Sequence, residues 1–87
     1  MISGLYYKDF SIVFNKLLKK SSISRYKIHQ FTGLDQGFLS CLSDASKSPG
    51  PETVMKIALA LVHYSNEITL YDVEVLFNSV GRSIKVN

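Results

Sequence analysis

The chain has 87 residues, of which 46% are hydrophobic and 20% are charged, and its net charge is +3. This length suits one small domain, 1–87, and the composition excludes a disordered chain and a membrane-spanning helix. The small positive charge permits nucleic-acid binding without requiring it, and the single cysteine, Cys41, excludes an intramolecular disulfide and a zinc knuckle. We therefore expect a cytoplasmic protein that holds no metal or cofactor.

The first half of the chain predicts one longer helix and two short ones. Apolar residues recur at the helical spacing i, i+3, i+4, i+7 and i+8 over residues 10–18. Two shorter helices follow, at 23–31 and 35–42, on either side of Gly33. Gly33 has no Cβ, so it tolerates the positive φ that commonly ends a helix.

The second half predicts two more helices after a loop at 46–51. Residues 54–62 repeat the full helical spacing, and a last helix starts at Thr69 and ends at Gly81. Residues 82–87 carry one weak apolar alternation and form either an ordered arm or a frayed tail.

Four of the predicted helices begin with a recognisable start signal. Ser24 and Asp35 can each accept a hydrogen bond from a first-turn N–H. Pro51 suits the first helical position, where the N–H that proline lacks would have no partner. Thr69 and Asp72 form a capping box. Together these elements predict an all-α fold, a compact bundle of about five short helices around one small core.

Residues 24–44 have the pattern of a DNA-binding helix-turn-helix, two short helices that cross at a tight turn. The apolar residues spaced to hold these helices together are Ile28, Leu34, Leu39 and Leu42. The chain resembles the Cro and lambda-repressor type of helix-turn-helix domain, the XRE-like family, over about residues 10–80. The residues that carry the resemblance are Ser24, Tyr26, Ile28, Thr32-Gly33-Leu34, Gln36, Phe38-Leu39-Ser40, Leu42, Pro49, Pro51-Glu52-Thr53-Val54, Ile57-Ala58 and Ala60-Leu61. The resemblance implies a lambda-repressor-like transcriptional repressor that binds double-stranded DNA as a homodimer.

In this family the second short helix lies in the major groove, which is about 12 Å wide and admits a helix about 10 Å across. The positions that would read bases are Asp35, Gln36, Gly37, Ser40 and Cys41. Gln36 is the strongest candidate because its amide both donates to and accepts from adenine, whereas a serine hydroxyl discriminates less. Cys41 either meets a thymine methyl group or lies half-buried.

The resemblance also implies phosphate contacts around the same unit, and the basic residues there are Arg25, Lys27, Lys47, Lys20 and Lys19. Arg25 and Lys27 fall near the start of the first short helix, where free N–H groups and the positive end of the helix dipole favour phosphate. Lys19 and Lys20 suit the last turn of a helix equally well as solvated side chains.

The last helix carries more apolar residues than one stripe needs. Leu70, Val73, Phe77 and Val80 are therefore candidates for a homodimer interface, although we favour their burial in the core. A core this small gains stability from dimerisation.

Several residues depart from the family pattern. His29 stands where the family has alanine or glycine, and we expect it to pack over Gly37. Asp35 adds a negative charge at the DNA-facing end, Gly37 has no side chain to read a base, and Ala45 replaces the glycine that usually follows the second helix. These departures favour an alternative, an adaptor or antitoxin-like interaction module that keeps the fold with weak or no DNA reading. A catalytic pair of Cys41 and His29 has no orienting carboxylate at usable spacing, so we expect no enzyme.

Overall fold

Five α-helices account for most of residues 2–85, the part of the chain that the computed structural model describes; side chains are described for residues 10–80. In chain order the helices are α1 (Ile2–Ser21), α2 (Arg25–Thr32), α3 (Gln36–Ser43), α4 (Pro51–Tyr64) and α5 (Leu70–Lys85). The predicted all-α fold with about five helices is confirmed for these residues. Within residues 2–85, no helix combines the length and the apolarity needed to cross a bilayer.

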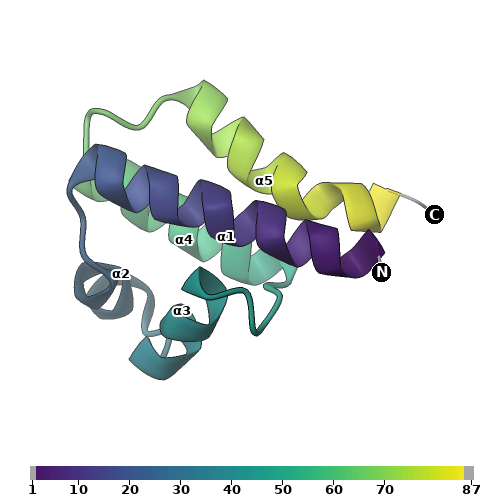
Figure 1. The fold of residues 1–87 in the computed structure, drawn as a ribbon. Helices are drawn as coiled ribbons and strands as arrows, with labels where there is room; N and C mark the ends of the chain where they lie inside the picture. Colours follow the sequence, from purple (N-terminus) through teal and green to yellow (C-terminus); the bar gives the residue numbers. More distant parts are fainter. Residues whose placement is uncertain (1, 86–87) are drawn as a thin grey trace.

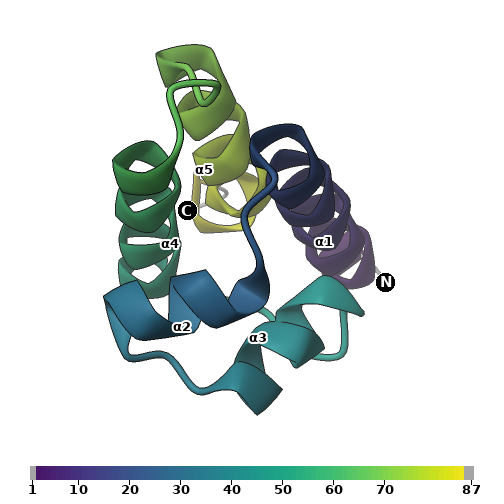
Figure 2. The ribbon, with the colours of Figure 1, turned by 90° about the vertical axis from the view of Figure 1, so that its left-hand side faces the viewer.

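The helices form a group of three long ones and a pair of short ones. α1 and α5 lie side by side, and α4 packs against both (Figure 1). α2 packs against α4 and α3 packs against α1, on the side of the molecule away from α5 (Figures 1 and 2). The two short helices therefore form a layer of their own, with one surface turned outward.

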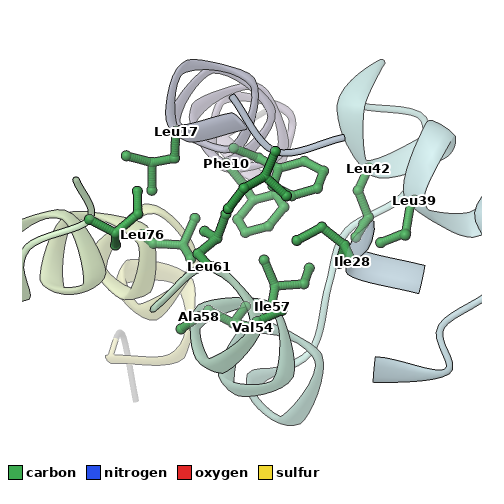
Figure 3. Close-up of a cluster of buried hydrophobic side chains, with 14 of the residues drawn as sticks. Phe10, Leu17, Ile28, Leu39, Leu42, Val54, Ile57, Ala58, Leu61 and Leu76 are labelled. Carbon is green, nitrogen blue, oxygen red and sulfur yellow. The ribbon is translucent and has the colours of Figure 1, made fainter. Parts of the chain in front are cut away.

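All five helices contribute side chains to one buried core (Figure 3). The rings of Phe10 and Phe14 stack with their centroids 5.5 Å apart. The other buried apolar residues are Leu17, Ile23, Ile28, Leu39, Leu42, Val54, Ile57, Ala58, Ala60, Leu61, Ile68, Leu76 and Val80. Among them Ile28 joins α2 to the core, and Leu39 and Leu42 join α3, so the predicted apolar contacts of the helix-turn-helix are confirmed.

The predicted capping residues Ser24, Gly33 and Asp35 are confirmed, while the helices run over 25–32 and 36–43 and not over 23–31 and 35–42. Ser24 caps α2, and its Oγ accepts a hydrogen bond from the Lys27 N–H at 3.2 Å. Gly33 ends α2 with φ +79°, the left-handed conformation that a residue with a Cβ rarely adopts. Asp35 caps α3 by accepting a hydrogen bond from the Phe38 N–H at 3.3 Å. Ser24 and Asp35 thus each cap a helix by bonding the N–H of a residue three positions later in the chain.

The ends of the outer helices differ from the prediction. α1 already begins at Ile2, and α5 continues past Gly81 to Lys85. The predicted helix end at Gly81 is therefore wrong. The predicted arm or tail at 82–87 is wrong for residues 82–85, which are helical, and residues 86–87 lie outside the described residues. One glycine costs a helix only about 1 kcal/mol, too little to end a helix of 16 residues.

Candidate nucleic-acid interface

α3 presents one polar face to solvent. Leu39 and Leu42 are buried, and with 3.6 residues per turn four of the predicted base-reading positions fall on the opposite face. These positions are Gln36, Gly37, Ser40 and Cys41. Cys41 is half-buried and the others are exposed. The structure thus brings these four residues together on one side of one helix.

Asp35, the fifth predicted base-reading residue, is occupied as the N-cap of α3. Its Oδ2 accepts the hydrogen bond from Phe38, and a Cβ added at Gly37 would lie 2.9 Å from the same oxygen. No His29 atom lies within 4 Å of that Cβ position. The expected packing of His29 over Gly37 is therefore wrong. Gly37 instead leaves room for the capping carboxylate.

Side chains of α2 hold the turn that leads into α3. The Gly33 N–H donates to the His29 carbonyl oxygen at 2.8 Å. Nδ1 of His29 lies 2.7 Å from the carbonyl oxygen of Leu34, and the Leu34 N–H donates to Oγ1 of Thr32 at 3.0 Å. In the sequence, His29 stood out only as an oversized residue at a helix crossing. The structure gives it a hydrogen-bonding role in the turn.

The end of α3 is closed without the usual glycine. Ala45 adopts the left-handed conformation with φ +68°. Asp44 stabilises this turn, because its Oδ1 accepts hydrogen bonds from Ser46 Oγ at 2.6 Å and from the Ser46 N–H at 2.9 Å. These two bonds, and after them the nearby positive charge of Arg25, hold the pKa of the Asp44 carboxyl below its ordinary value. The residue pattern did not predict that Asp44 forms part of this surface.

Three of the predicted phosphate contacts lie around α2 and α3. Arg25 is the first residue of α2 and is exposed. Nζ of Lys27 lies 5.2 Å from the centre of the Tyr64 ring, and Nζ of Lys47 lies 5.9 Å from the centre of the Phe38 ring. The contact with Phe38 places the Lys47 ammonium beside α3, and the contact with Tyr64 places the Lys27 ammonium beside α4.

The two lysines at the end of α1 point to different neighbours. Nζ of Lys20 lies 2.7 Å from Oδ2 of Asp72, on α5, so this ammonium is paired away from the short helices. Lys19 is exposed and follows Asn15 by one helical turn, and Nδ2 of Asn15 donates to the Ser43 carbonyl oxygen of α3 at 2.9 Å. Lys19 therefore lies on the side of α1 that carries α3, and Lys20 does not.

The charge on the exposed side of this layer is uneven. α3 itself contains no lysine or arginine, and a carboxylate stands at each of its ends, from Asp35 and Asp44. The positive charges of Lys47, beside Phe38, and of Arg25, near Asp44, flank the helix instead, whereas the Lys27 ammonium lies over Tyr64 of α4. Any attraction to phosphate must therefore come from the residues beside α3.

An aromatic cluster joins α2 to α4. The Phe31 ring centre lies 4.8 Å from that of His63 and 6.0 Å from that of Tyr64, and the last two rings are 4.9 Å apart. Lys27 reaches this cluster through Tyr64. The residue pattern did not predict this cluster, since its members come from two segments 32 or more residues apart.

The four candidate interface residues on α5 divide into three groups. Val80 is 5% exposed and belongs to the core, and Val73 and Phe77 pack against the core from half-buried positions. Leu70 is 87% exposed, so the expected burial in the core is wrong for this residue, which begins α5. An exposed apolar stripe, not expected from the sequence, runs along α4 and consists of Met55, Leu59 and Val62.

Comparisons with family models, with curated proteins and with solved structures give no match to this chain. Within the described residues, no three His, Cys, Asp or Glu side chains come together as ligands for a metal ion. The surface formed by α2, α3 and the loop after α3 is therefore the candidate functional site.

Proposed function

We propose that this chain is a DNA-binding transcriptional regulator of lambda-repressor-like fold, a repressor that acts in the cytoplasm. One observation supports this proposal above others: an exposed face of α3 lies next to the cations of Arg25 and Lys47, and α2 carries a third exposed cation, Lys27. A polar helix face suits base edges in the major groove, and flanking cations suit the phosphates on either side. The proposed function needs no catalytic residue, metal or cofactor.

Gln36 and Ser40 are the proposed base-reading side chains. Gln36 stands in the first turn of α3, where its amide N–H can donate to adenine N7 while its oxygen accepts from adenine N6. Ser40 lies one turn later on the same face, and Cys41 at the edge of that face can meet a thymine methyl group. Gly37 lets the α3 backbone approach the base edges closely.

Arg25, Lys27 and Lys47 are the proposed phosphate contacts, and Lys19 is an outer fourth. The start of α2 adds free N–H groups and the positive end of the helix dipole. Lys20 is left out of this set because Asp72 neutralises it on the α5 side. These contacts would fix the orientation of α3 without distinguishing one sequence from another.

Binding of a homodimer to two half-sites requires two copies of α3 about 34 Å apart, one helical turn of DNA. Leu70 is the exposed apolar residue that we propose for the centre of such an interface, with Val73 and Phe77 at its border. Selection from a random duplex library tests the proposal. We expect enrichment of two related half-sites about 10 base pairs apart, whereas a library without enrichment would contradict sequence-specific reading.

A second candidate function is a protein-interaction adaptor, and the carboxylates of Asp35 and Asp44 at the two ends of α3 favour it. Negative charge at both ends of the exposed face repels phosphate but suits a basic protein partner. The substitution Arg25→Glu distinguishes the two functions. A DNA-binding regulator loses DNA affinity on this change, and an adaptor retains its partner.

A further inference from the structure

The Leu34 peptide, in the turn before α3, is held at both of its polar groups by side chains of α2. Its N–H donates to Thr32 Oγ1 at 3.0 Å, and its carbonyl oxygen lies 2.7 Å from His29 Nδ1. The Thr32 hydroxyl in turn donates to the Ile28 carbonyl oxygen at 2.7 Å. Neither the N–H nor the carbonyl of Leu34 can turn without breaking a hydrogen bond to α2.

The partner of His29 also fixes which ring nitrogen carries the proton. A carbonyl oxygen only accepts hydrogen bonds, so Nδ1 must be the donor, and its 2.7 Å distance is at the short end for an N–H···O bond. The Tyr26 ring lies 5.9 Å from the imidazole, centre to centre, and the imidazole is half-buried. These contacts restrict the orientation of the donor.

The hydrogen bond between His29 and Leu34 lies directly before the first turn of α3. Leu34 directly precedes Asp35, the N-cap of α3, and the next residue is Gln36. The far end of α3 is attached to α1 through the hydrogen bond from Asn15 to the Ser43 carbonyl. We call the hydrogen bond between His29 and the Leu34 carbonyl the clamp. It therefore acts on the end of α3 that carries the principal base-reading side chain, Gln36.

We infer that His29 is a positioning residue that sets the angle of the first turn of α3 and so controls discrimination between DNA sequences. This inference rests on the proposed function. Overall attraction to DNA comes from phosphate contacts on other residues and does not depend on this angle to the same degree. Loss of the clamp should therefore weaken binding to a preferred site more than binding to mixed-sequence DNA.

Three variants test the inference. His29→Ala removes the donor. His29→Asn retains one, because its Nδ2 is bonded to Cγ as Nδ1 is in histidine. Gln30→Ala is the matched control on the same helix, since Gln30 bonds the Tyr26 hydroxyl and not the turn. Each variant is measured for its Kd on a duplex selected by the unaltered protein and on a mixed-sequence duplex at the same salt concentration.

Selectivity is the Kd on the mixed-sequence duplex divided by the Kd on the selected duplex. We expect this ratio to fall about tenfold in His29→Ala, while the affinity for mixed-sequence DNA changes less than about twofold. The ratio should return to within about threefold in His29→Asn and stay unaltered in Gln30→Ala. A His29→Ala variant that keeps the full ratio would overturn the inference while leaving the proposed function intact. An equal loss on both duplexes would also overturn it.

A measurement without DNA separates this inference from the proposed function. We expect the amide hydrogens of Phe38 and Leu39 to exchange several-fold faster in His29→Ala and at nearly the normal rate in His29→Asn. Unchanged exchange in both variants would disprove the clamp. If the unaltered protein selects no duplex, the proposed function fails and the role of His29 in reading DNA fails with it, whatever the exchange rates show.

Discussion

The ammonium of Lys20 lies 2.7 Å from the carboxylate of Asp72 and ties the last turn of α1 to the first turn of α5. The same carboxylate oxygen accepts a hydrogen bond from the Thr69 N–H at 3.0 Å, and Thr69 Oγ1 accepts one from the Asp72 N–H at 3.1 Å. The predicted capping box is thus confirmed, and its acidic member also forms the ion pair between the two helices. Asp72 stabilises the side of the molecule opposite to the proposed DNA surface.

Substitution of Asp72 tests this double role. Asp72→Ala removes the ion pair and the acceptor for Thr69, and we expect it to lower the free energy of unfolding by about 1–2 kcal/mol. Asp72→Asn keeps an oxygen acceptor and should cost about half as much. Urea unfolding measures both, with Lys20→Ala as the control for the ion pair. Equal stability of all three variants and the unaltered protein would contradict the prediction.

The same carboxylate gives a predicted pH dependence. The hydrogen bond from Lys20, followed by that from the Thr69 N–H, holds the pKa of Asp72 below its ordinary value. A carboxyl whose pKa is lower in the folded state stabilises the fold above its unfolded pKa of about 3.9, and this stabilisation disappears as the pH falls through the folded pKa. Unfolding measured from pH 7 to pH 2.5 should therefore show a smaller acid-induced loss in Asp72→Asn. Identical pH profiles would be evidence against the pairing.

Gly37→Ala should have a small net effect for two opposing reasons. Alanine favours the helix by about 0.5–1 kcal/mol relative to glycine, but its Cβ would meet Asp35 Oδ2 at 2.9 Å and disturb a cap worth about 1 kcal/mol. In an Asp35→Ala background the obstruction is absent, so Gly37→Ala should then stabilise the protein. A double-mutant cycle by thermal or urea unfolding measures this coupling. Full additivity of the two substitutions would refute it.

Gln36→Ala should change DNA selectivity more than DNA affinity. If the amide reads an adenine, its removal costs about 1–3 kcal/mol at a selected site and relaxes the preference at one base position. Binding to mixed-sequence DNA should remain close to normal. Competition binding with the selected duplex and its single-base variants measures both effects. A Gln36→Ala variant with unaltered base preference would remove Gln36 from the reading surface.

The parts of the structure that could be predicted from the sequence are local ones. Ser24, Asp35 and Thr69 cap helices through atoms three residues away, so their residue types and spacing are sufficient to identify them. The helical spacing likewise predicted most of the buried residues. Val62 is an exception, since a residue at i+8 lies about 80° around the helix from Val54, at the edge of the buried face, and it is exposed.

The parts that could not be predicted depend on contacts between distant segments. Nothing near Lys20 in the sequence indicates that its partner is 52 residues away. The influence of Arg25 on Asp44 similarly requires α2 and α3 to be packed together first. His29 is closer to its partner, Leu34, but its bond exists only because Gly33 reverses the chain with a positive φ.

Binding to mixed-sequence duplex DNA across a salt series, with the variants Arg25→Ala and Lys16→Ala, tests the proposed docking surface most directly. Lys16 is an exposed control that precedes Lys20 by one turn, on the side of α1 that faces α5. We predict that the logarithm of the association constant for DNA falls linearly with the logarithm of the salt concentration. The steepness of this fall should be smaller by about 1 in Arg25→Ala and unaltered in Lys16→Ala. No binding at low salt, or the same slope in both variants, would contradict DNA docking through α2 and α3.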